Sequence, residues 1–178
     1  MDRICFGGSS LTLPAFVAFM RRVTPCGTLL ELGSGQMTTA FVRAGLIVVS
    51  VEHDQAYINR CGSHFIHAPI VDGWYDREIL RDRLRGIEYD MLLIDGPPGH
   101  IGRQAVLENL DTIYFNDQNP SVVMIDDINR PAERRIFEAL AKSYPHSEIV
   151  RDFEPHEHFA GILYRSEPCP AATNPGTR

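Results

Sequence analysis

Two glycines and two glutamates stand at a spacing that suits the binding of a nucleoside. Gly33 and Gly35 flank Ser34 directly after a short apolar run, and Glu31 lies within that run. Glycine lets the backbone approach a ligand closely because it has no side chain. Glu52 follows Gly33 by nineteen residues and ends a second apolar run, where an acidic side chain can accept hydrogen bonds from both hydroxyls of a ribose. The pattern therefore predicts a nucleoside site at the ends of two strands.

Two ligand classes use such a turn, and the glycine spacing separates them. A dinucleotide-binding turn has the pattern G-x-G-x-x-G, and Thr38 stands here in place of its third glycine. The pattern E-x-G-x-G resembles motif I of the class I S-adenosylmethionine-dependent methyltransferases, which implies S-adenosylmethionine as the cofactor. The expected cofactor contacts are Glu31, Gly33, Ser34, Gly35, Glu52, His53 and Asp95. An NAD-dependent oxidoreductase and a noncatalytic nucleotide-binding domain remain alternatives.

The segment after a weaker apolar run at 64–70 supplies candidates for contact with the adenine ring. Ile70 and Trp74 lie in or next to a loop that is predicted at the same sheet edge as the glycine turn. Their apolar side chains are candidates to sandwich the ring. For Trp74, packing in the core or at its rim is the alternative.

Three further carboxylates are predicted to meet at this edge of the sheet. Asp95 ends one apolar strand, and Asp126 and Asp127 follow another. Converging carboxylates repel one another unless protons or a cation compensate, and a divalent cation with oxygen ligands is one solution. The pattern resembles the magnesium site of the catechol O-methyltransferases and the macrolide-sugar O-methyltransferases, which implies that these three residues bind Mg²⁺ and that the metal activates a substrate hydroxyl. The alternative is that they cap a helix or hydrogen-bond a loop.

Histidines supply candidates for a general base, because imidazole titrates near neutral pH. His100 and His158 are these candidates, and Asp95 is the third predicted catalytic residue. His156 and His158 alternate along an extended segment, so metal ligation is a second hypothesis for both. Arg103 either binds an anionic group of the substrate or begins a helix.

A second resemblance covers residues 72–165. It is carried by Gly73-Trp74-Tyr75-Asp76, by Tyr89-Asp90, by Ile94-Asp95-Gly96-Pro97-Pro98-Gly99, by Gly102-Arg103 and by His158-Phe159. These segments resemble the glucuronoxylan 4-O-methyltransferase family, which implies methylation of a sugar hydroxyl. The chain departs from that family at Pro98, where arginine is common, and in its shorter N-terminal part.

Apolar runs alternate with helical patterns, which predicts a parallel sheet covered by helices on both faces. Strands are expected at 28–32, 46–51, 64–70, 89–95, 121–125, 147–152 and 159–165, and helices at 13–23, 37–44, 54–62, 76–85, 103–114 and 131–143. The last two strands lack a helix between them and should be antiparallel. This ending resembles the methyltransferase fold, whose reversed seventh strand lies between the fifth and the sixth. The predicted fold class is α/β, a single Rossmann-like methyltransferase domain with a mostly parallel seven-stranded sheet.

Length and composition suit one soluble domain. Residues 1–10 are expected to be an irregular lead-in, residues 11–167 the methyltransferase domain and residues 168–178 a disordered tail. The net charge of −6 argues against nucleic-acid binding, and no apolar run is long enough for a membrane span. The four cysteines are scattered, as expected for reduced thiols. We expect a cytoplasmic protein that does not associate with membranes, and a homodimer.

These patterns together predict an S-adenosylmethionine-dependent methyltransferase that acts on a hydroxyl of a sugar or small hydroxylated molecule, with assistance from Mg²⁺. An N-methyltransferase needs no metal, because a carboxylate or histidine can accept the amine proton. It is the alternative within the same enzyme class.

Overall fold

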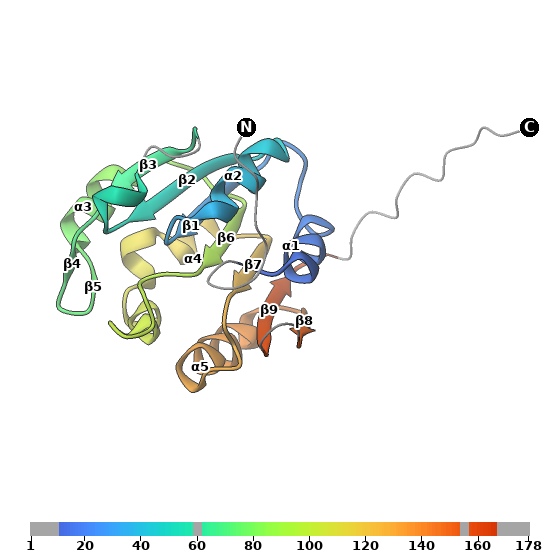
Figure 1. Cartoon of the computed structure of the whole chain (residues 1–178). Coiled ribbons are helices and arrows are strands. Elements are labelled where there is room, and N and C mark those ends of the chain that lie inside the picture. The colour runs from blue at the N-terminus through green and yellow to red at the C-terminus, as the bar shows by residue number, and fades with distance from the viewer. Residues whose placement is uncertain (1–10, 59–61, 154–156, 167–178) are drawn as a thin grey trace, which may run out of the picture.

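The computed structural model describes residues 11–58, 62–153 and 157–166, and its centre is a seven-stranded sheet (Figure 1). The strands are β1 (Thr28–Leu32), β2 (Ile47–Glu52), β3 (His64–His67), β6 (Met91–Ile94), β7 (Val122–Ile125), β8 (His146–Asp152) and β9 (His158–Tyr164). Their order is β3-β2-β1-β6-β7-β9-β8. β9 is antiparallel to both of its neighbours, and the other paired strands are parallel. The predicted fold class and the reversed last strand are confirmed.

The strand order reverses next to β1, and this places the candidate residues. The chain runs from β1 outward to β2 and β3, and then returns to place β6 on the other side of β1. The carboxyl ends of β1 and β6 therefore flank a switch point, where open α/β sheets bind their ligands. Because β9 is reversed, its first residue lies at the same rim as the ends of β6 and β7.

Helices cover both faces of the sheet and close two apolar cores. α1 (Leu13–Met20) and α2 (Gln36–Arg43) bury Phe19 and Phe41 against one face. α3 (Arg77–Arg83), α4 (Phe115–Gln118) and α5 (Pro131–Leu140) cover the other face, where they bury Leu80 and Ile136. The alternation of side chains along each strand supplies both cores, because successive residues point to opposite faces.

Two predicted helices are wrong in extent. The helix expected from Asp54 is a single 3₁₀ turn, η1 (Gln55–Tyr57), which Asp54 caps by accepting from the Ala56 N–H at 2.8 Å. The helix expected at 103–114 is replaced by two 3₁₀ segments, η2 (Arg103–Glu108) and η3 (Leu110–Ile113), followed by α4. The remaining predicted helices are present with shifted ends, and a 3₁₀ turn, η4 (Ala141–Ser143), continues α5.

The break between η2 and η3 is made by side-chain hydrogen bonds. Asn109 Nδ2 donates to the Ala105 carbonyl, and Thr112 Oγ1 donates to the Asn109 carbonyl. Trp74 Nε1 donates to Thr112 Oγ1 at 3.1 Å, and Arg77 Nε donates to Asn109 Oδ1 at 2.6 Å. Side chains that bond local carbonyls compete with helical hydrogen bonds. Contacts from distant parts of the chain therefore decide the local structure here.

A small hairpin takes the place of the expected loop before α3. β4 (Ile70–Val71) and β5 (Trp74–Tyr75) are antiparallel and are joined by Asp72 and Gly73, both with positive φ. Asp-Gly is a favoured two-residue hairpin turn. The hairpin directs Trp74 and Tyr75 into the core, where both are fully buried.

Three expectations concern segments beyond the described residues. The lead-in at 1–10 and the tail at 168–178 fall outside the ranges given above, as does His156. None of the helices within the ranges given combines the length and the apolar character that a membrane span requires.

Candidate functional site

The glycine turn after β1 is held tightly on one side and is open on the other. Gly33 has φ +86°, and a Cβ there would lie 3.1 Å from the backbone of Asp95 and from the Gly96 Cα. The turn and the end of β6 therefore touch only because residue 33 has no side chain. A Cβ on Gly35 would meet nothing within 4 Å. This leaves space over the turn that a larger side chain would fill and that a ligand can use.

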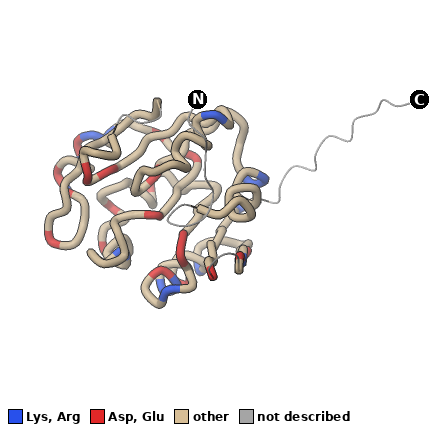
Figure 2. Tube along the Cα trace, in the orientation of Figure 1, with Lys and Arg blue, Asp and Glu red and all other residues tan. Residues whose placement is uncertain are grey.

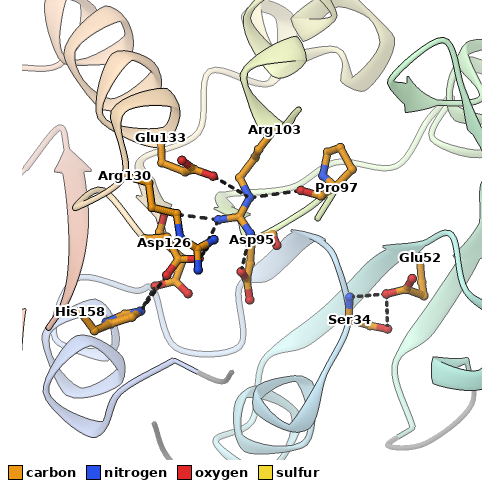
Figure 3. Close-up of polar contacts among 10 residues, drawn as sticks. Ser34, Glu52, Asp95, Pro97, Arg103, Asp126, Arg130, Glu133 and His158 are labelled. Carbon is orange, nitrogen blue, oxygen red and sulfur yellow. Dashed lines mark hydrogen bonds and ion pairs between the residues drawn. The ribbon is translucent and has the colours of Figure 1, made fainter. Parts of the chain in front are cut away.

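Glu52 lies at the end of β2 directly beside this turn (Figure 3). Its Oε2 accepts from the Ser34 N–H at 2.9 Å and from Ser34 Oγ at 3.0 Å. Its Oε1 accepts from the N–H groups of His53 and Asp54 at 2.7 and 2.8 Å. Glu52 is 3% exposed, and its carboxylate is fully hydrogen-bonded by the loops around it. Glu52 thus lies at the expected strand end beside the glycine turn, and it contacts the turn directly through Ser34, which the sequence did not predict.

Glu31 is buried beneath the glycine turn and contacts α2 and β2. Its Oε2 accepts from Thr38 Oγ1 at 2.8 Å and from Ser50 Oγ at 2.7 Å. Thr38 Oγ1 also accepts from the Gly35 N–H at 3.0 Å, so the first turn of α2 and the glycine turn are tied together through one buried carboxyl group. Burial, partly offset by the two hydroxyl donors, raises the pKa of Glu31 to about 7.

A second group of polar residues lies along the same rim, at the ends of β6 and β7 (Figure 3). Its centre is Arg103, whose side chain is 4% exposed. Arg103 Nη2 donates to the Asp95 carbonyl at 2.8 Å and to Asp95 Oδ1 at 3.2 Å. Nη1 donates to Asp127 Oδ2 at 3.4 Å, and Nε lies 3.8 Å from Glu133 Oε1. One buried cation therefore lies within ion-pair distance of three carboxylates.

The surroundings raise the pKa of two of these carboxyl groups. For Asp95 the causes are desolvation and the charge of Asp126, which Arg103 opposes only in part. About a third of the Asp95 side chain (34%) is still exposed, so the group faces the rim. For Asp127, desolvation and Asp126 raise the pKa, while Arg103 and Arg130 oppose the shift. Carboxyl groups with raised pKa values are better proton acceptors near neutral pH than ordinary aspartates.

His158 and Asp126 form a close pair at the same rim. His158 Nε2 lies 2.9 Å from Asp126 Oδ1 and 3.7 Å from Asp127 Oδ1. Burial alone would lower the pKa of His158, but the hydrogen bond to Asp126 and the charges of Asp126 and Asp127 outweigh it and raise the pKa. Potential metal-ligating atoms of Asp126, Asp127 and His158 lie within 4.8 Å of one another. Within the described residues this group does not include Asp95, which faces Arg103 instead.

The other predicted site residues are more widely spread. His53 lies beside Glu52, with Nδ1 2.7 Å from Glu52 Oε1. His100 is exposed in the loop between β6 and η2. Ile70 is half-buried in the hairpin, and Trp74 is fully buried with its N–H bonded to Thr112. The structure thus favours core packing for Trp74, because its ring has no surface on which an adenine can stack.

A cavity of about 620 Å³ lies at the edge of the sheet, between β3 and α3. Its lining residues are Ile58, Phe65, His67, Glu78, Ile79, Asp82 and Arg83. It adjoins the loop that follows Glu52, because His67 Nε2, in the lining of the cavity, lies 3.1 Å from the His53 carbonyl oxygen. Sequence patterns missed these residues because the cavity is made by an edge strand and a helix that meet only in the folded chain.

Comparison with solved structures identifies the fold. No protein-family model matches the sequence, and no curated protein matches it. A methyltransferase from Pyrococcus furiosus is similar over 85% of this chain and 81% of its own, with a TM-score of 0.58 and 13% identity. The C-terminal domain of precorrin-6Y C5,15-methyltransferase from Rhodobacter capsulatus is similar over 90% and 93%, with a TM-score of 0.57 and 9% identity. A putative precorrin-6Y C5,15-methyltransferase domain from Corynebacterium diphtheriae gives a TM-score of 0.54 at 12% identity, over 85% of this chain and 95% of its own. The chain has the Rossmann-like methyltransferase fold.

Proposed function

We propose that the chain is an S-adenosylmethionine-dependent methyltransferase whose acceptor is a hydroxyl group of a sugar or another small hydroxylated molecule. The observation that carries the proposal is the contact between the Gly33 turn and Asp95. It joins the turn that is predicted to bind a nucleoside to a carboxylate cluster on a single rim of a methyltransferase fold. The methyl donor and the methyl acceptor can therefore be bound next to each other.

The residues of the turn fit the cofactor. The open space over Gly35 admits a ligand next to the backbone, and Glu52 offers a buried carboxylate to the ribose. The adjoining cavity provides Ile58, Phe65 and Ile79 as apolar partners for the adenine ring, in place of the predicted Trp74. Bound S-adenosylmethionine supplies an electrophilic methyl group on a sulfonium.

Asp95 is the group best placed to take the acceptor proton. Its backbone touches the glycine turn, its carboxylate faces the rim, and its pKa is raised. Arg103 fixes its orientation through two hydrogen bonds. A positioned general base contributes roughly 10²–10⁴-fold to the rate. His158 is the second candidate, with Asp126 as its partner, and the exposed His100 is the third.

Two of the three predicted metal ligands, Asp126 and Asp127, remain candidates, because Asp95 faces Arg103 instead. Asp126, Asp127 and His158 offer three donors, which suit a divalent cation with mixed oxygen and nitrogen ligands. Arg103 already pairs with Asp95 and Asp127, and this favours catalysis by side chains alone. Treatment with EDTA separates the two versions: unchanged activity supports proton transfer to Asp95, and loss of activity that Mg²⁺ restores supports the metal.

An amine acceptor is the second candidate, and the charge balance of the cluster favours it. The four carboxyl groups of Asp95, Asp126, Asp127 and Glu133 outnumber the three basic groups that pair with them, those of Arg103, Arg130 and His158. A protonated amine would be attracted to this cluster. A nucleic-acid acceptor is disfavoured by the net charge of −6, and Lys and Arg are spread over several elements rather than gathered in one stripe (Figure 2).

The proposal is tested by the formation of S-adenosylhomocysteine during incubation with S-adenosylmethionine and panels of sugars, catechols and small amines. Asp95→Asn should keep cofactor affinity within about threefold and lower turnover by at least about 100-fold. Asp90→Asn is the matched control, because Asp90 accepts from the Thr28 N–H at the opposite end of the sheet. Equal turnover by Asp95→Asn and the wild type would contradict the assigned role.

A further inference from the structure

The acceptor positions of Glu52 are filled by the chain itself, and this limits how a ligand can reach the carboxylate. Four donors are bonded to its two oxygens: the N–H groups of His53 and Asp54, and the N–H and hydroxyl of Ser34. A carboxylate has about four such positions. A ribose hydroxyl that bonds to Glu52 must therefore replace one of these donors.

Ser34 is the donor that can leave. The His53 and Asp54 amides are fixed because they directly follow Glu52 in the chain. The hydroxyl of the half-buried Ser34, in contrast, is released by rotation about one side-chain bond, without movement of the backbone. It also has a second acceptor within reach, because Ser34 Oγ lies 3.5 Å from the Tyr57 carbonyl oxygen in η1.

We propose that the Ser34 hydroxyl is an exchangeable donor that competes with the ribose of the bound ligand for Glu52, and so sets the affinity for that ligand. When a ribose hydroxyl takes its place on Oε2, the Ser34 hydroxyl turns to the Tyr57 carbonyl. The exchange replaces a hydrogen bond to a charged oxygen with one to a neutral oxygen, and charge-assisted bonds are roughly twice as strong. The ligand therefore binds more weakly than it would without the competing hydroxyl.

This inference rests on the proposed function and predicts opposite changes in stability and affinity. Ser34→Ala removes the competing donor and keeps the Ser34 N–H bond to Glu52. Without ligand, its melting temperature should fall by about 2–6 °C, because one charge-assisted hydrogen bond is lost. Its affinity for S-adenosylhomocysteine, measured by isothermal titration calorimetry, should rise by roughly 3- to 10-fold.

Two further variants isolate the hydroxyl. Ser34→Thr keeps the donor and should bind S-adenosylhomocysteine within about twofold of the wild type. Ser121→Ala is the matched control, because Ser121 Oγ donates to the Asp90 carbonyl at the other end of the sheet, and its dissociation constant should not change.

The outcomes separate this inference from the proposed function. Equal or weaker binding by Ser34→Ala, with the wild type binding normally, would contradict the exchange and leave the methyltransferase assignment standing. If neither protein bound S-adenosylhomocysteine while both were folded, the proposed function itself would be contradicted.

Discussion

Glu31 shows what a single buried residue contributes to the site. Its carboxyl group joins β1, β2 and α2 through the hydroxyls of Ser50 and Thr38, and it is 2% exposed. An isolated buried carboxylate is costly, so the folded chain favours the protonated form. This preference determines whether the contribution of Glu31 to the free energy of unfolding rises or falls with pH.

We predict that Glu31 lowers the stability of the wild type as the pH rises from about 4.5 to 7. The pKa of Glu31 is about 7 in the folded chain and near 4.5 in the unfolded chain, so the folded chain binds this proton more tightly. The proton's contribution to the free energy of unfolding is therefore complete below pH 4.5 and is lost as the pH rises through 7. The lost contribution is on the order of 3 kcal/mol. Glu31→Gln stays uncharged, and its free energy of unfolding relative to the wild type should rise across this range in urea titrations. A constant difference between pH 4.5 and 8 would contradict the assignment.

Gly33 gives a second prediction at this scale. A side chain there would need φ +86° and would press on the backbone of Asp95 and Gly96 at 3.1 Å. Gly33→Ala should lower stability by about 1–3 kcal/mol and weaken binding of S-adenosylhomocysteine, because the turn and β6 must separate. Gly86→Ala has a similar φ of +77° with open space around it, and provides the control for backbone strain alone. Equal affinity of the two variants for S-adenosylhomocysteine would show that the close contact between Gly33 and Asp95 is not needed for binding.

At the scale of the elements, Arg103 joins the ends of β6 and β7 to the first turn of α5. It contacts Asp95, Asp127 and Glu133, and it also donates to the carbonyl groups of Pro97 and Asp126. Removing the cation would leave buried carboxylates unpaired, which costs far more than losing an exposed pair.

We therefore predict that Arg103→Gln destabilises the fold by roughly 3–5 kcal/mol, measured by urea unfolding. Arg81→Gln is the matched control, because Arg81 pairs with the exposed Asp111 at 2.7 Å and its loss should cost at most about 1 kcal/mol. Similar losses in the two variants would mean that the Arg103 cluster does not hold these elements together.

The elements also show what the sequence can predict. Apolar runs followed by Gly33 or by Asp95 predicted the central parallel strands, because buried strands have a strong local pattern. The Asp72-Gly73 turn also carried a local hairpin signal, which the prediction of a loop overlooked. The break after Glu108 had no such signal, because it depends on hydrogen bonds from Trp74 and Arg77.

For the site, sequence placed Glu31, Glu52 and Asp95 at the correct strand ends, because strand ends follow from apolar runs. It did not predict that Arg103 would pair with the carboxylates, since that depends on how η2 packs against α5. Nor did it predict that Ser34 would bond to Glu52, a contact set by loop geometry. The local sequence pattern thus predicts where a residue lies along its strand, whereas tertiary packing decides which side chains that residue contacts.

At the scale of the whole molecule, the strand order gathers residues from distant parts of the chain on one rim. Gly33, Glu52, Asp95, Asp126 and His158 lie at strand ends or starts that only this topology brings together. The acceptor, the metal, the homodimer, the cytoplasmic location and the domain limits at 11–167 stay predictions. The use of S-adenosylmethionine at the Gly33 turn is the claim on which the others depend.

The most direct test of that claim is calorimetric titration of the wild type and Glu52→Gln with S-adenosylhomocysteine. We predict one site per chain in the wild type. Glu52→Gln should bind roughly 10- to 100-fold more weakly, because a hydrogen bond to a charged group is lost. Absence of heat with folded wild type, or equal affinity in the two proteins, would contradict the account.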